Sequence, residues 1–253
     1  MGGAIARGMA SGNIVQASDI TVADISDDTL AKINAFDPAI ETTKDGRAAV
    51  KGADLVVIAV KPWLLEEVVG NIKDVLDYRT QAVASIVAGV TFASLKKMLD
   101  NGSGKFPVLF RVMPNTAVSV GEGVNFIAYD GASVEQVDDL SAIFSELGPT
   151  FVVEEKMIGP ATSLASCGIA FALKYIDAAI KGGVEQGFSQ EDARIIVMQT
   201  VRGALAMMES NGTMPQVEID KVTTPGGVTL KGLKAMAEAG FDEAVLAGLR
   251  ESK

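Results

Sequence analysis

The sequence predicts an α/β domain built on a doubly wound, mostly parallel sheet, followed by an all-helical domain. The first half alternates β-branched segments with amphipathic helical segments joined by short connections. The second half has apolar residues at three- and four-residue spacing and no strand pattern after about residue 155. We therefore expect two domains, over residues 1–154 and 155–253.

The elements of the first half follow in chain order. A short apolar strand over residues 20–23 ends at Asp24, and Ser26 or Asp27 is expected to cap a helix over 27–36. The nearly continuous β-branched run 54–60 is typical of a strand buried on both faces. The remaining segments are a helix over 64–76, a strand over 82–87, a helix over 92–99, strands over 108–113 and 124–128, a helix over 134–147 and a strand over 150–154.

The second half predicts three long helices, over residues 158–186, 190–211 and 228–249, with Gly187, Gly212 and Gly240 at expected stops. The first of them is long for a single globular domain and too apolar to have one exposed side. Such a helical half often completes its core with a second subunit, so we expect a homodimer. A self-contained bundle is the alternative.

Composition narrows the class of protein. The net charge of −10 argues against nucleic acid or an anionic membrane as the main partner. No uninterrupted apolar run reaches the roughly 18 residues typical of a membrane span. The first residues lack the pattern of a secretory leader, and the lone Cys167 fits a reducing compartment, so we expect a cytoplasmic protein.

The chain has no histidine. This removes the commonest general acid and base, and with a single cysteine it leaves no expected metal site. Chemistry in which a cofactor performs the difficult step, such as hydride transfer, fits this restriction.

The first nine residues match the end of a glycine-rich dinucleotide fingerprint followed by its helix, with the preceding strand absent from this chain. The predicted sheet is thus Rossmann-like but lacks its first strand. Asp24 lies about twenty residues after Gly2 and Gly3, where a carboxylate would bind the ribose hydroxyls and repel a 2′-phosphate. This favours NADH over NADPH. Asp24 as a helix cap is the alternative.

A second candidate site follows residue 222. Pro225, Gly226 and Gly227 produce a sharp turn directly before a helical pattern. The N–H groups at the start of that helix have no intrahelical partner, so the turn could hold a small carboxylate. An ordinary turn with an N-cap is the alternative.

Together these segments resemble the pyrroline-5-carboxylate reductase family over essentially the whole chain. The two most specific motifs are Met113-Pro114-Asn115-Thr116 and Val222-Thr223-Thr224-Pro225-Gly226-Gly227-x-Thr229. The other matches are Gly2-Gly3-Ala4-Ile5, Ala59-Val60-Lys61-Pro62, Ala88-Gly89-Val90-Thr91 and Val120-Gly121-Glu122-Gly123.

The resemblance implies an N-terminal dinucleotide-binding domain and a helical domain that forms an interlocked dimer or a ring of dimers. It also implies hydride transfer from NADPH or NADH to the C=N carbon of 1-pyrroline-5-carboxylate, which yields L-proline. The cofactor-binding positions it implies are Met1, Gly2, Val60, Lys61, Pro62, Ala88 and Gly89. The substrate-binding positions are Asn115, Val222, Thr224, Gly226, Gly227 and Thr229, and Thr229 is the catalytic candidate.

One departure from the family pattern is the run Ala165–Phe171, in which Ile169 stands for a proline and Cys167 for a serine. Two alternatives stay open. A related dehydrogenase of the 6-phosphogluconate or β-hydroxyacid type would use Lys174 on the helix between the domains. A non-catalytic, cofactor-binding paralogue would explain the short fingerprint.

Overall fold

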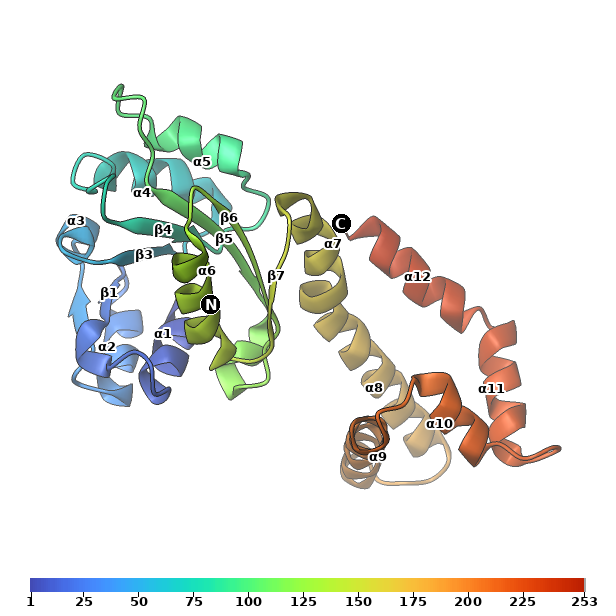
Figure 1. The fold of residues 1–253 in the computed structure, drawn as a ribbon. Helices are drawn as coiled ribbons and strands as arrows, with labels where there is room; N and C mark the ends of the chain where they lie inside the picture. The colour runs from blue at the N-terminus through green and yellow to red at the C-terminus, as the bar shows by residue number, and fades with distance from the viewer. Residues whose placement is uncertain (253) are drawn as a thin grey trace. The chain divides into compact units, whose positions relative to one another are not determined.

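The computed structural model describes residues 1–252, which fall into two compact units, Met1–Ser166 and the chain from Cys167 onward. Figure 1 traces both. The first unit extends past the boundary that we expect at 154/155, because Ile158 is buried in the core of the sheet. The domain boundary at 154/155 therefore stays a prediction. It does not coincide with the boundary between the two compact units, which follows Ser166.

The first unit is built on a five-stranded sheet with the order β3-β4-β5-β6-β7. Strands β3, β4 and β5 are parallel, β6 is antiparallel to β5, and β7 is parallel to β6. The strands are β3 (Leu55–Ile58), β4 (Ala82–Ser85), β5 (Val108–Pro114), β6 (Asn125–Asp130) and β7 (Thr150–Val152).

Strands β1 (Thr21–Ala23) and β2 (Glu41–Thr43) form a separate two-stranded parallel sheet. Among residues 1–252, no strand precedes helix α1 (Gly2–Ser11), and none pairs with both β1 and β3. The expected doubly wound arrangement without its first strand is confirmed, and it takes the form of two sheets.

Helices cover both faces of the larger sheet (Figure 1). On one face α3 (Gly46–Val50), α4 (Leu65–Ile72), α5 (Phe92–Leu99) and α7 (Ile158–Ala161) contribute to a core with Val56, Val83 and Leu109. On the other face α1 and α6 (Val134–Ser145) pack on Ala84, Phe110 and Ile127. Because neighbouring residues of one strand enter opposite cores, both faces of the sheet are buried, as the β-branched runs predict.

The observed helices agree with most of the predicted ones. Helices α2 (Asp27–Phe36), α5 and α9 (Gln190–Asn211) have the expected bounds, and Ser26 caps α2. The predicted helix 158–186 is interrupted by a π-helical segment, η5 (Thr162–Cys167), before α8 (Gly168–Glu185).

Some expected elements differ. The segment 228–249 is two helices, α11 (Val228–Glu238) and α12 (Phe241–Glu251), because Gly240 adopts a left-handed conformation with φ of 81°. Strand β2, helix α3 and helix α10 (Pro215–Val222) have no counterpart among the predicted elements. The short 3-10 turns are η1 (Ala17–Asp19), η2 (Pro62–Leu64), η3 (Thr116–Val120) and η4 (Glu155–Met157).

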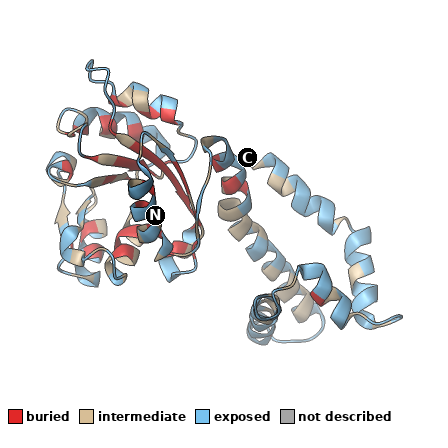
Figure 2. Cartoon of the chain, viewed as in Figure 1, coloured by how far each residue is buried: buried red, intermediate tan, exposed pale blue. Residues whose placement is uncertain are grey.

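The second unit has almost no core of its own. Among its described residues, only Ala193 and Glu218 are buried, and Figure 2 shows its helices almost entirely in the colours of exposed and intermediate residues. Large apolar side chains are exposed on each of its helices, including Leu173, Ile195, Leu205, Val217, Leu230 and Val245. A unit this poor in buried apolar surface needs a second copy to bury its side chains.

One helical stretch, Glu155–Glu185, is 31 residues long with a mean hydropathy of 1.4 in its most apolar window, which is enough to cross a membrane. Charged residues interrupt the stretch, which is why a search for an uninterrupted apolar run does not find it. Length and composition alone do not separate a membrane span from an interface helix.

A charged residue on α8 should disrupt the dimer. Leu173 is 58% exposed in the single chain, and we expect Leu173→Glu to make the protein monomeric or unfolded, because a carboxylate would be buried without a partner. Light scattering coupled to size exclusion measures the mass. Leu173→Met, which keeps the apolar volume, should remain dimeric; a dimeric Leu173→Glu variant would show that α8 lies outside the interface.

Candidate active site

The loops after three parallel strands meet at one edge of the larger sheet. Val60, Lys61 and Pro62 follow β3, Ala88 and Gly89 follow β4, and Asn115 follows β5. The carboxyl ends of parallel strands lie at the same edge, which is where open α/β sheets bind their ligands. The structure thus brings together most of the cofactor-binding positions predicted for this unit.

The start of α1 reaches the same edge. A Cβ atom added to Gly2 would lie 2.8 Å from the Cβ of Ala59, directly after β3, so only glycine allows this approach. No side chain caps the first turn of α1. The N–H groups of Gly2 and Gly3 are therefore available for an anion such as a pyrophosphate, whereas that of Ala4 donates to Met1 O, and the predicted role of Met1 and Gly2 fits this geometry.

Asp24 follows β1 in the smaller sheet, and its Oδ1 accepts a hydrogen bond from Ser26 N at 2.8 Å. The helix cap itself is Ser26, whose Oγ accepts from Thr29 N at 3.3 Å. The capping alternative for Asp24 is therefore wrong in detail, since Asp24 shapes the turn before the cap. Its predicted contact with a ribose stays a prediction.

Asn115 is buried, with 3% of its surface exposed, and its side chain bonds within the protein. Its Oδ1 accepts from Ala117 N at 3.1 Å and Val124 N at 3.3 Å, and its Nδ2 donates to Ala165 O at 3.4 Å. The side chain holds the loop after β5 against the Ala165–Phe171 run that departs from the family pattern. Contact between Asn115 and substrate stays a prediction.

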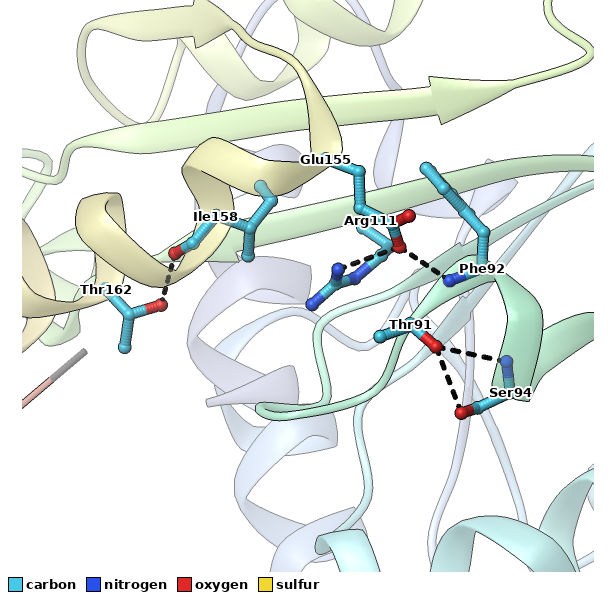
Figure 3. A network of polar contacts seen from close by, with 7 residues as sticks. All are labelled: Thr91, Phe92, Ser94, Arg111, Glu155, Ile158 and Thr162. Carbon is cyan, nitrogen blue, oxygen red and sulfur yellow. Dashed lines mark hydrogen bonds and ion pairs between the residues drawn. The ribbon is translucent and has the colours of Figure 1, made fainter.

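An ion pair at the same edge is not among the predicted site residues. Arg111 Nη1, on β5, donates to Glu155 Oε1 at 2.9 Å, and the same oxygen accepts from Phe92 N at 2.6 Å (Figure 3). Glu155 therefore fixes the start of α5, directly after the loop that contains Ala88 and Gly89. The one feature of the sequence that could have indicated this ion pair is an arginine within the otherwise apolar β5 pattern.

The segment Thr223–Thr229, which is predicted to be a carboxylate cradle, lies in the second unit. Gly226 has φ of 75°, and Gly227 N donates to Thr224 O at 2.9 Å, which closes the turn. Helix α11 begins at Val228 with no side-chain cap, so its first N–H groups are left for a ligand, and Thr229 lies in this first turn. Gly227 is the N-cap of α11, so the alternative of an ordinary turn with an N-cap is not contradicted, and binding of a carboxylate stays a prediction.

A polar cluster lies on α10 (Pro215–Val222), the helix that precedes this turn. Glu218 Oε1, on α10, accepts from Lys221 Nζ at 2.7 Å, Thr213 Oγ1 at 2.5 Å and Asn211 Nδ2 at 3.1 Å. The hydrogen bonds from Lys221 and then Thr213 lower the pKa of the Glu218 carboxyl to about 2. The carboxyl is therefore ionised at neutral pH.

The remaining candidate, Lys174, shows no sign of a site. The side chain of Lys174 is 80% exposed and lies 3.9 Å from Asp177, which is typical of a solvated helix charge. Within residues 1–252, no group of three His, Cys, Asp or Glu side chains is placed to bind a metal ion.

Comparison with known proteins agrees with this arrangement. The family described as pyrroline-5-carboxylate reductase dimerisation matches residues 155–253, and the family described as NADP oxidoreductase coenzyme F420-dependent matches residues 1–89. The chain is 36% identical to a pyrroline-5-carboxylate reductase of Aquifex aeolicus, covering 84% of this chain and 77% of the relative. It is 31% identical to pyrroline-5-carboxylate reductase 1 of Dictyostelium discoideum, covering 98% of this chain but only 46% of that relative.

Among solved structures, the chain resembles that of Plasmodium falciparum pyrroline carboxylate reductase with NADP bound. The TM-score is 0.87 at 26% identity, over 100% of this chain and 91% of that chain. An N-terminal NADP oxidoreductase domain followed by a helical dimerisation domain defines the protein as an NAD(P)H-dependent oxidoreductase that works as a dimer. Within that class, the chain belongs to the pyrroline-5-carboxylate reductase family.

Removing the charge of Glu155 should destabilise the first unit. The Arg111 side chain is only 9% exposed, so Glu155→Gln leaves a guanidinium without its charged partner. We expect the free energy of unfolding to fall by about 1.5–3 kcal/mol, the range for hydrogen bonds to charged groups. Urea denaturation measures the change.

The neighbouring Glu154 provides the matched control for this substitution. It pairs with Lys156 on the surface, where the two side chains are 72% and 74% exposed, so Glu154→Gln should cost less than about 1 kcal/mol. Equal effects of the two substitutions would contradict a special role for the Arg111–Glu155 pair.

Proposed function

We propose that this protein reduces 1-pyrroline-5-carboxylate to L-proline with a hydride from NADH or NADPH. The observation that carries the proposal is the uncapped start of α11 behind the Thr224–Gly227 turn, which offers main-chain donors to a small carboxylate. Family membership supports the same substrate, since the relatives bear the name of this reaction.

The residues of the first unit would hold the cofactor. The first turn of α1 suits the pyrophosphate, and the loops after β3 and β4 suit the rest of the dinucleotide at the sheet edge. The bound cofactor supplies the hydride, so the chain needs only to bind and orient. This agrees with a chain that contains no histidine.

The residues of the second unit would hold the substrate. The substrate carboxylate accepts hydrogen bonds from the N–H groups at the start of α11, which fixes the ring. A cyclic imine is readily protonated in water before it binds, so no strong acid is required. The Thr229 hydroxyl oxygen accepts a hydrogen bond from the N–H of this iminium. The hydride then adds to the carbon of the C=N bond, and the ring nitrogen becomes the amine of proline.

The net charge of the chain and the exposed apolar helices of the second unit support a proposal about compartment, assembly and partners. We propose a cytoplasmic enzyme that assembles as dimers or rings of dimers and binds neither nucleic acid nor membrane, given its net charge of −10. In this assignment the apolar side of Glu155–Glu185 faces a second copy rather than lipid. A related hydroxyacid dehydrogenase has no support from Lys174, which is solvated.

Loss of the Thr229 hydroxyl should impair turnover. We expect Thr229→Ala to lower kcat/KM for pyrroline-5-carboxylate by roughly tenfold or more, the effect of losing a hydrogen bond to a charged group. Proline formation followed by cofactor oxidation measures it. Thr200→Ala, which removes an exposed hydroxyl bonded to Ile196 O on α9, is the control.

Three outcomes separate the alternatives. Full activity of Thr229→Ala would remove its role. A dimeric wild-type protein that binds cofactor but forms no proline would indicate a non-catalytic paralogue. Activity on a hydroxyacid that disappears in Lys174→Ala would indicate the related dehydrogenase.

Asp24 should control the choice of cofactor. A carboxylate at the end of β1 repels a 2′-phosphate, so we propose a preference for NADH. Asp24→Ser keeps an acceptor for the turn at Ser26 and should raise the kcat/KM ratio of NADPH to NADH by about tenfold, or ~1.4 kcal/mol. Asp28→Ser, on the exposed face of α2, should leave the ratio unchanged. An unchanged ratio in Asp24→Ser would place the ribose elsewhere.

A further inference from the structure

Glu218 is an unusual residue for a helical unit with little core. It is 8% exposed, although every other acidic residue of the described second unit is more exposed. Its Oε1 accepts three hydrogen bonds, while its Oε2 is buried without a hydrogen-bond partner among the described residues. A buried carboxylate with one unsatisfied oxygen costs stability, so its presence needs another explanation.

The three donors to Glu218 come from successive parts of the chain. Asn211 is the last residue of α9, Thr213 lies in the connection that follows, and Lys221 is in the last turn of α10. One carboxylate oxygen therefore ties the end of α9, the connection and both turns of α10 into a single unit. Because α10 ends at Val222, this unit determines where the next residues begin.

The segment that follows is the carboxylate cradle. Only one residue, Thr223, separates α10 from Thr224, whose carbonyl closes the turn. Thr223 Oγ1 also donates to Asp220 O on α10 at 3.3 Å, a second connection between helix and cradle. The cradle side chains Thr224, Val228 and Thr229 are exposed in the single chain, so they do not anchor the loop themselves.

We propose that Glu218 is a positioning residue of the substrate site: its carboxylate anchors α10 and so sets the placement of the Thr223–Thr229 segment. This rests on the proposed function, in which that segment holds the substrate carboxylate. Glu218 does not touch substrate in this proposal. It acts through Lys221, Thr213 and Asn211, which all donate to its Oε1.

The first test measures the cradle itself and is independent of catalysis. Amide hydrogen exchange of the bonded amides of α10 and of Gly227, whose N–H donates to Thr224 O, is compared in the wild-type dimer and in Glu218→Gln, which keeps the shape but removes the charge. We expect these amides to exchange roughly tenfold faster in the variant, while the amides of β4 and β5 exchange as in the wild type. Unchanged exchange of the α10 and Gly227 amides would overturn the proposal.

The second test measures substrate binding. In Glu218→Gln we expect KM for pyrroline-5-carboxylate to rise by roughly tenfold, whereas KM for the cofactor changes by less than about twofold because its positions lie in the first unit. A merely structural role would instead lower the active fraction and leave both KM values unchanged, and that result would also overturn the proposal.

Two further variants sharpen the outcome. Lys221→Met should reproduce the rise in KM, and Lys221→Arg, which restores a charged donor, should reverse most of it. Glu238→Gln, from an exposed pair with Lys234 at 3.7 Å on α11, is the matched control and should behave as the wild type. If the wild type forms no proline, the proposed function fails, while the exchange experiment still decides the role of Glu218.

Discussion

Strand β5 has a hydrogen-bonded strand on each side and helices over both faces, and its residues Leu109 to Val112 are all buried. This double burial determines most of the first unit. A strand in this position must be apolar on both sides, and its parallel neighbour β4 and the next strand β3 must end at the same edge. The loops after these strands therefore lie close together because of the sheet topology, and no direct contact between the loops is needed.

Arg111 is the one charged residue within β5, and its ion pair connects β5 to the start of α5. Its side chain is only 9% exposed, and an unpaired charge there would be costly. Glu155 neutralises it and at the same time accepts the N–H of Phe92, so one carboxylate joins β5 to the start of α5 (Figure 3). The loop between β4 and α5 is thus anchored at both ends.

The second unit differs from the first because it buries little surface of its own. Its cradle, closed by the Thr224–Gly227 turn, rests on helices whose apolar sides are exposed in one chain. Because the second unit needs a partner to bury these side chains, its stability should depend on protein concentration. A local polar anchor such as Glu218 is useful in this setting, since packing within the single unit cannot hold α10 in place.

Much of the fold was predictable because its signals are local. The bounds of α2, α5 and α9 follow from caps and apolar spacing, and the break at Gly240 was visible as a stop signal although the helix was expected to continue. The uncapped turn before α11 was predictable in the same way. The short elements β2, α3 and α10 were not, because three to eight residues carry too little periodicity and depend on tertiary contacts.

The sequence by itself determined the alternation of strands and helices, the family and the two motif regions, because these depend on hydrophobic period, glycine, proline and short spacings. Only the tertiary structure decided the partners of the buried polar groups: Asn115 bonds inward, Arg111 pairs with Glu155, and Glu218 collects three donors. These pairings depend on strand register and helix packing between residues that can be far apart in the chain. The free energy of a buried polar contact is set by that final geometry, and no local pattern encodes it.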